Sequence, residues 1–218
     1  MSAILMPELV LHNALESIVN MIRKDLKDNV GNDNLTILYG LLGEDSEGNP
    51  LKVNSYNYFL QAKKIFSSVQ NLSVSFGYNL SVAKIISLHI LLPSEAYESS
   101  SLGQQSGDDE EELQQFYNCN YQVMITSDNS AEVSVVYNVL KSMLVMLIPH
   151  LEIMGLLTPK LSGGDVMMQD DIIPASIFHK VLNISFRYEL CVPVALEKIV
   201  MKGFYAELKA IDYFGESN

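Results

Sequence analysis

The stretch that decides the fold is FYNCNYQVMITSDNSAEVSVVYNVLKSMLVMLI, residues 116–148, in which a strand pattern gives way to a helix pattern. Residues 116–126 alternate apolar and polar side chains, which is typical of a half-buried strand. Asn129 stands three residues before Glu132, a capping-box arrangement that predicts the start of a helix. The helix continues until Pro149 kinks or ends it. Its apolar side chains form one continuous face: Val133, Val136, Leu140, Met143, Leu144, Leu147 and Ile148.

The residues before this stretch predict two further helices and two further strands. Apolar side chains at three- and four-residue steps over 8–28 predict an amphipathic N-terminal helix. A shorter helix is predicted over 55–67, where apolar and aromatic side chains share a face. The period changes to two at 72–78, which predicts a strand, and a second strand is predicted over 84–92, ended by Pro93.

The residues after it predict closing strands. Residues 158–174 carry turn chemistry and are expected to be irregular, whereas 177–192 alternate over a long strand. A last strand is predicted over 204–210. The order helix, strands, long helix, strands predicts an α+β fold. We expect a single domain, 1–218, in which an antiparallel sheet with a long hairpin insertion packs against the N-terminal helix and one long central helix.

The hairpin insertion, residues 94–115, is rich in Ser, Gln, Gly and acidic side chains. Such a tract cannot bury a core and repels itself, so we expect a mobile acidic loop between two strands. Loops of this length are uncommon unless they are functional or disordered. The candidate interaction residues of the chain therefore lie here: Tyr97, Asp108, Asp109, Glu110, Glu111 and Glu112.

Acidic side chains outnumber basic ones by 26 to 14, for a net charge of −12. Binding nucleic acid through its phosphates requires clustered Lys and Arg. The densest basic positions, Arg23-Lys24 with Lys27 and Lys63-Lys64, stand among apolar residues at helical spacing and are interpreted as solvated helix faces. We expect no specific binding of nucleic acid, and an acidic surface would let DNA slide past without adhering.

Composition also favours a protein that works in an assembly. Hydrophobic residues make up 48% of the 218, which is enough for a sizeable core. Charged residues are only 18%, below the roughly 25% usual in soluble domains, as in a chain that hides part of its surface against other proteins.

Two cysteines, Cys119 and Cys191, lie inside apolar strand patterns and not in a CxxC spacing, so we expect buried free thiols in a reducing compartment. The first seven residues lack the basic flank and long apolar stretch of a signal peptide. No segment is expected to span a membrane, because Lys141, Pro149 and Glu152 interrupt the best candidate. We expect synthesis in the cytosol.

The polar residues predict no reactive site. No two histidines have the spacing of metal ligands, and neither HExxH nor GxSxG occurs. Both cysteines fall where a core strand residue belongs, which argues against a thiol nucleophile. The acidic run 108–112 lacks the alternating ligands and glycine bend of a calcium loop. We therefore expect no catalytic residues, no metal and no cofactor; the chain is expected not to be an enzyme.

The pattern resembles the tail-terminator and tail-completion proteins of tailed bacteriophages, a group that includes neck and head-to-tail connector subunits. The likeness lies in the hairpin strand 116–126, the turn TSDNS (126–130) and the strand FHKVLNISFRYEL (178–190). Residues 35–66 and 192–218 are longer than the family pattern. The resemblance implies a ring of six or twelve copies around the channel for the genome, with no catalytic residues.

On this basis we expect a structural subunit of a ring in the neck or tail of a tailed bacteriophage, joining head and tail components around the DNA channel. The chain would then be made in the cytoplasm of the bacterial host and end in the virion. Its partners would be further copies of itself and neighbouring portal, adaptor or tail proteins, with DNA passing nearby and no membrane. The alternative is a soluble module that binds a peptide or small ligand, with the acidic loop as a lid.

Overall fold

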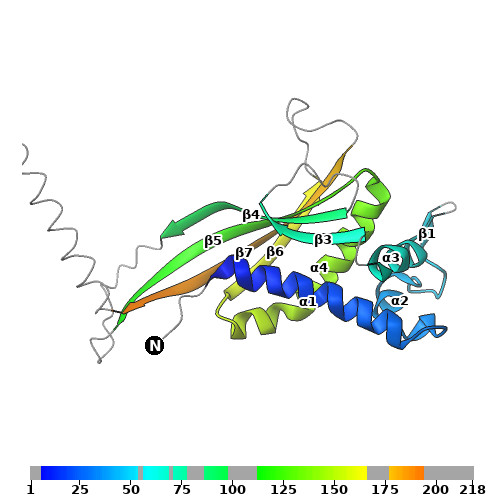
Figure 1. Ribbon diagram of the computed structural model, residues 1–218, viewed down its shortest axis with the longest axis horizontal. Coiled ribbons are helices and arrows are strands. Elements are labelled where there is room, and N and C mark those ends of the chain that lie inside the picture. The colour runs from blue at the N-terminus through cyan, green and yellow to red at the C-terminus, as the bar shows by residue number, and fades with distance from the viewer. Residues whose placement is uncertain are drawn as a thin grey trace, which may run out of the picture.

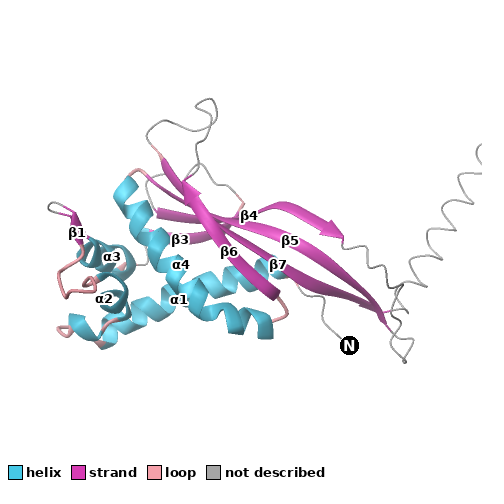
Figure 2. Ribbon diagram, turned by 180° about the vertical axis from the view of Figure 1, so that it is seen from behind, coloured by secondary structure: helices cyan, strands magenta, loops and turns pink. Residues whose placement is uncertain are grey.

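The computed structural model describes residues 6–53, 56–68, 71–77, 86–97, 112–165 and 177–193. It shows a five-stranded sheet in the order β3-β4-β5-β7-β6, with the helices packed beneath it (Figures 1 and 2). The α+β class predicted from the sequence is confirmed.

The elements are α1 (Pro7–Asp28), the 3-10 turn η1 (Asp33–Leu35), α2 (Ile37–Leu42), β1 (Lys52–Val53), β2 (Tyr56–Asn57), α3 (Tyr58–Ser67), β3 (Leu72–Phe76), β4 (Ile86–Tyr97), β5 (Glu112–Ser127), α4 (Ser130–Ile153), β6 (Leu157–Asp165) and β7 (Phe178–Pro193).

The hydrophobic core lies between one face of the sheet and the helices. The face carries Val123 and Ile125 of β5 beside Leu182 and Ile184 of β7, all of them buried. From the other side, α1 and α4 contribute the apolar faces that their periodicity predicted. The fully buried helical side chains include Leu11, Leu15, Ile18 and Ile22 of α1 and Val136, Leu140 and Leu144 of α4. We call this face of the sheet the helix-side face and the opposite one the outer face.

The sheet is mixed and not wholly antiparallel, which corrects the prediction for one pair of strands. β3 runs parallel to β4, from Leu72 opposite Ile86 to Phe76 opposite Ile90. The chain leaves β3 at Phe76 and re-enters the sheet beside the start of β3, so the two strands point the same way. The pairs β4–β5, β5–β7 and β6–β7 are antiparallel as expected.

The strands next to the predicted loop are longer than expected. β4 does not end at Pro93 but continues to Tyr97 after a shift in register between Leu91 and Ser94. Proline has no N–H for the ladder and is tolerated at an edge or a bulge; β3 pairs with β4 only as far as Ile90, so Pro93 meets both conditions. β5 likewise begins at Glu112, so both ends of the predicted loop 94–115 belong to strands.

Residues 157–165 form β6, although they were predicted to be irregular. The turn-like Ser162-Gly163-Gly164-Asp165 explains the error, because glycine pairs are a usual signal of a turn. At Gly163 the glycine has another purpose. A Cβ atom there would clash with the carbonyl oxygen of Val181 and lie 2.9 Å from Oη of Tyr137, so the backbone approach requires its absence.

The helices α1, α3 and α4 lie where the sequence predicted helices, and they differ from the prediction only at their ends. α1 and α3 match the predicted 8–28 and 55–67 closely, and the long helix extends past Pro149 to Ile153. Asn129 caps α4 by accepting a hydrogen bond from N–H of Ala131 at 3.0 Å, but the reciprocal half of the capping box is absent. Glu132 instead accepts from Oγ of Ser127 at 3.3 Å. The predicted strand 204–210 lies outside the described residues.

Replacing Leu140 with alanine tests the packing of α4. The side chain is 0% exposed, so Leu140→Ala should leave a cavity and lower the free energy of unfolding by about 2–5 kcal/mol. Val145→Ala is the matched control on the same helix, because Val145 is 50% exposed and should change that free energy by less than about 0.5 kcal/mol. Urea unfolding followed by circular dichroism measures both. Equal losses would show that α4 does not pack as described.

Candidate interaction surface

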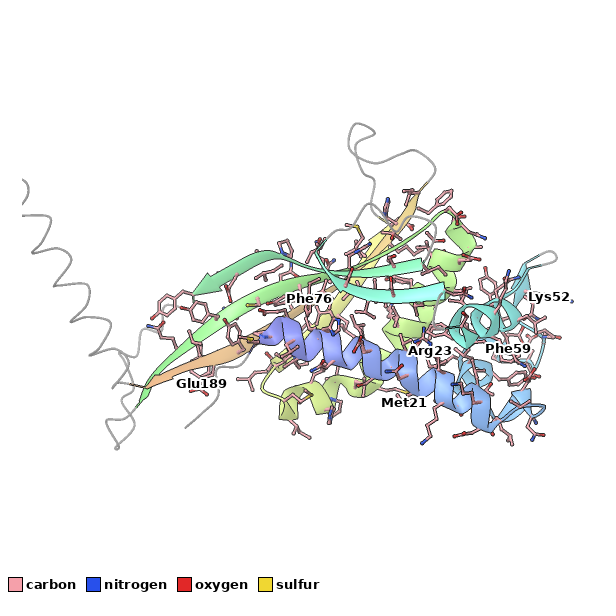
Figure 3. All side chains as sticks on the ribbon, viewed as in Figure 1. Met21, Arg23, Lys52, Phe59, Phe76 and Glu189 are labelled. Carbon is pink, nitrogen blue, oxygen red and sulfur yellow. The ribbon has the colours of Figure 1, made fainter. Side chains whose placement is uncertain are left out.

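One end of the sheet extends beyond the helices. It consists of residues 94–97 of β4, 112–120 of β5 and 185–193 of β7, which pair in register, and we call it the arm. Figure 1 shows β5 and β7 continuing past the first turn of α1, and Figure 3 places Glu189 on this part of β7. Strands of 16 residues are well above the usual five or six. The arm is therefore a distinct surface feature of the fold.

Three tyrosines lie side by side across the helix-side face of the arm. Tyr97, Tyr117 and Tyr188 are directly opposite one another in the register of β4, β5 and β7. The ring centroids of Tyr97 and Tyr117 are 5.9 Å apart in an edge arrangement, and those of Tyr117 and Tyr188 are 5.6 Å apart and stacked. Cross-strand aromatic pairs of this kind stabilise a sheet without a covering helix. We call these three residues the tyrosine ladder.

Glu95 connects the tyrosine ladder to Cys119 through hydrogen bonds. Glu95 accepts a hydrogen bond from Oη of Tyr188 at 2.8 Å and from Sγ of Cys119 at 3.3 Å. Burial, and then the hydrogen bond to Glu95, raises the pKa of the Cys119 thiol to about 12. The same two causes in the same order raise the pKa of Tyr188. Both groups therefore stay protonated near neutral pH, as structural donors and not as nucleophiles.

The first turn of α1 marks the boundary between the arm and the rest of the fold. Oη of Tyr121 donates a hydrogen bond to Oε2 of Glu8 at 2.9 Å, and the Tyr121 ring stacks on Phe186 at 5.6 Å. Burial, followed by the contact with Glu8, raises the pKa of Tyr121. On the outer face, the guanidinium of Arg187 lies 3.9 Å from the centroid of Phe116 in a cation–π contact. Both faces of the arm are thus ordered by aromatic contacts.

The predicted interaction residues fall at the tip of the arm or beyond it. Tyr97 is the last residue of β4, is 55% exposed and belongs to the tyrosine ladder. Glu112 is the first residue of β5, with its backbone opposite Pro193. The side chain of Glu112 and the whole of Asp108, Asp109, Glu110 and Glu111 lie outside the described residues. The sequence argument missed Tyr117, Tyr188 and Glu95; its only signal for them was the unusual length of strand 177–192.

A second group of polar side chains, which we call the histidine cluster, lies on the outer face at the other end of the sheet. It contains Ser75, His89, Thr126 and His179, and His89 is 2% exposed. Nδ1 of His89 lies 3.1 Å from the carbonyl oxygen of Gly77 and 2.9 Å from Oγ of Ser75. Because a carbonyl only accepts, Nδ1 carries the proton, and Nε2 accepts from Oγ1 of Thr126 at 3.4 Å.

This arrangement does not make Ser75 a nucleophile. An activating imidazole must accept the serine proton on the nitrogen that faces it, and in His89 that nitrogen is already protonated. Burial lowers the pKa of His89, with a smaller opposing effect of the bond to Gly77. Burial, and then the charge of His89, lowers the pKa of His179. Both ring nitrogens of His179 are buried and have no hydrogen-bond partner. The histidine cluster is thus a structural group in which burial disfavours the protonation of both imidazoles.

Metal ligands and a membrane-spanning helix are the two remaining features to consider in the described residues. Within those ranges, no three His, Cys, Asp or Glu side chains gather as they would to hold a metal ion. α4 is long and apolar enough to cross a membrane by length and composition alone, and 44% of its most apolar window is buried inside the fold. Its contacts with β5, β6, β7 and α3 are those of a core helix.

Neither a scan against known protein families nor a search of curated proteins returned a match to this chain.

Alkylation of Cys119 tests the burial of its thiol beside the tyrosine ladder. A thiol pKa of about 12 leaves a thiolate fraction more than about a thousandfold below that of a free cysteine at pH 8. In the folded protein the Cys119 peptide should remain unmodified by iodoacetamide at pH 8, and in 8 M urea it should react fully. Peptide mapping by mass spectrometry measures the difference. Equal labelling in both conditions would contradict the described burial.

The histidine cluster predicts a loss of stability in acid. The folded state holds His89 and His179 neutral, whereas the unfolded chain binds protons below about pH 6.5. Stability is therefore complete above that pH and falls as the pH drops below it, by up to about 1.4 kcal/mol per pH unit for each proton. Urea unfolding between pH 7.5 and 5 should show this slope.

His179→Leu is expected to reduce the slope, since it removes one of the two groups. His150→Leu is the matched control, because His150 is exposed near the end of α4, and it should keep most of the wild-type slope. If His179→Leu changed the slope no more than the control, the assigned protonation state of the histidine cluster would be wrong.

Proposed function

We propose that the chain is a structural subunit of a multimeric ring in the neck or tail of a tailed bacteriophage, joining head and tail components around the DNA channel. The observation that carries this proposal is the arm, a three-stranded extension that continues past the first turn of α1 and carries the half-exposed Tyr97. An extension of this kind is suited to contacts with other protein subunits, since tyrosine is enriched in protein interfaces.

The order of the elements supports the proposal. An N-terminal helix (α1), a strand pair with a long connection (β4 and β5), a long helix (α4) and closing strands (β6 and β7) follow one another as in the pattern that resembles the tail-terminator and neck proteins. The connection between β4 and β5 joins Tyr97 to Glu112 at the tip of the arm, so this hairpin is the part that protrudes.

Charge and internal chemistry support the same role. A net charge of −12 disfavours adhesion to DNA, as a channel through which DNA must slide requires. The buried hydroxyl and thiol groups have structural hydrogen-bond partners: Tyr188 and Cys119 donate to Glu95, and Tyr121 donates to Glu8. The expected partners are further copies in a ring of six or twelve, and portal, adaptor or tail proteins above and below it.

One observation favours a second candidate function. Among the described residues, 94–97 of β4 and 188–193 of β7 have a strand partner on one side only, and peptide-binding modules use such edges to add an extended peptide as a further strand. A module of that class would act as a single copy. The number of copies in solution therefore separates the two functions.

Native mass spectrometry and negative-stain microscopy of the purified full chain test the proposal. We expect masses of six or twelve copies of the 24.3 kDa chain and ring-shaped particles, either alone or after co-expression with the products of neighbouring genes. Because cyclic contacts are concentration-dependent, the measurement covers about 1–100 μM. A single copy in every condition, with or without those products, would contradict a ring.

A further inference from the structure

We propose that an exposed apolar stripe near the end of α4 is the docking site of residues 194–218 of the same chain. The stripe consists of Met146, Pro149 and Ile153, and we call it the α4 stripe. The contact lies within one copy and does not depend on the proposed ring. Residues 194–218 lie outside the described residues, so they enter through their sequence and through the position at which β7 ends.

The α4 stripe is one continuous face of the helix. Its residues are three and four positions apart, which places their side chains on the same side of an α-helix. Met146 is 57% exposed, Ile153 is 82% exposed and Pro149 is exposed as well, with the half-exposed Val145 at the margin. The opposite side of the same turns packs into the core, where Leu144 is 0% exposed. A helix that is apolar on both sides is usually covered on both.

The end of α4 lies within reach of residues 194–218. β6 begins at Leu157, four residues after Ile153, and Leu157 lies opposite Arg187 of β7. Four residues span at most about 14 Å, and Pro193 is six residues, or about 20 Å of strand, beyond Arg187. With one strand spacing added, Pro193 is at most about 40 Å from Ile153. Residues 194–218 span about 38 Å as a helix and about 85 Å when extended, so they can return to α4.

The sequence of this segment carries an apolar face that matches the α4 stripe. Over 196–211, apolar side chains recur at helical steps on one side: Leu196, Ile199, Val200, Phe204, Leu208 and Ile211. Lys198, Lys202 and Lys209 fall on the opposite side, and Glu197 and Glu207 are the exceptions on the apolar side. Residues 204–210 alone also fit the strand predicted above, but only the helical period accounts for the whole of 196–211. Because an isolated helix of this length is marginal in water, it requires an apolar partner.

A segment of the same chain suits the α4 stripe better than a separate partner does. Stable complexes bury roughly 800 Å² on each partner, over about 20–30 residues a side. The α4 stripe offers three side chains and the margin at Val145. A tethered segment is held at an effective concentration on the order of millimolar, so a small apolar contact is enough to keep it docked.

Oxidation of methionine by hydrogen peroxide tests the docking in the full chain. Met146 belongs to the α4 stripe, whereas Met21 lies on α1 and is 40% exposed (Figure 3). By their exposure in the described fold, Met146 should oxidise at least as fast as Met21. If residues 194–218 cover Met146, it should oxidise at least about fivefold more slowly than Met21. Peptide mapping by mass spectrometry measures both rates, and slow oxidation of Met143, which is 3% exposed, shows that the protein remains folded.

Two neighbouring substitutions identify the segment that covers the stripe. Phe204→Asp places a charge on the apolar side of 196–211 and should raise the oxidation rate of Met146 to that of Met21. Tyr205→Asp is the matched control, because Tyr205 falls on the side of the lysines, and it should leave Met146 protected. If Phe204→Asp does not fold, the wild-type rates of Met146 and Met21 remain decisive.

Three outcomes would overturn the docking. The first is oxidation of Met146 as fast as that of Met21 in the wild type. The second is an equal effect of Phe204→Asp and Tyr205→Asp, or protection that persists in Phe204→Asp. The third is protection that is lost in single copies, identified by native mass spectrometry on dilution, since a second copy would then be what covers the α4 stripe.

Discussion

The structure depends on the pairing of β5 with β7, which stay in register over 16 residues from Glu112 opposite Pro193 to Ser127 opposite Phe178. At about 3.3 Å per residue each strand is about 53 Å long, whereas α1 and α4 reach only about 33 and 36 Å at 1.5 Å per residue. Helices of these lengths cannot cover strands of that length. Since α1, α2, α3 and α4 gather toward one end of the sheet, the other end extends beyond them as the arm (Figure 2).

A sheet end without a helical layer must stabilise its own side chains. In the arm, aromatic rings do so by stacking on one another, and the hydroxyl groups of Tyr117 and Tyr188 donate hydrogen bonds to Gln115 and Glu95. Tyr188 illustrates both, because its ring stacks on Tyr117 and its hydroxyl donates to Glu95. Leucine or valine at position 188 would lack the hydroxyl group that donates to Glu95. The arm is therefore ordered by its own side chains, and Tyr97 remains half-exposed.

The sequence predicted those parts of the fold that depend on local periodicity. The α+β class, α1, α4 and the long strand β7 all follow from which side chains recur at steps of two or of three and four. The errors have a common physical origin, since each depends on a contact between distant segments. β6 looked like a turn because Gly163 serves a close approach to Val181, and β4 continues past Pro93 because β3 has already ended.

The surface of the arm was predicted only in part for the same reason. Tyr97 was expected to matter because it stands beside the acidic tract, but its partners Tyr117 and Tyr188 lie 20 and 91 residues away in the chain. Register across three strands brings them together, and register is set by the pairing of whole strands and not by local sequence. The histidine cluster is similar. His89 of β4 and His179 of β7 lie near each other because only one strand, β5, which carries Thr126, lies between β4 and β7.

The distribution of covered and open edges also bears on function. Where the helices lie beneath the sheet, β3 pairs with one edge of the unit β4–β5–β7 and β6 pairs with the other, so β3 and β6 are the edge strands there. β3 ends before the arm, and β6 covers β7 only as far as Arg187. The 26 acidic residues of the chain offered ample means to charge these edges, yet residues 94–97 and 188–193 contain only Glu95 and Glu189, and Glu95 is held by Tyr188. The outer part of the arm is therefore the part of the described sheet in which β4 and β7 are themselves the edge strands.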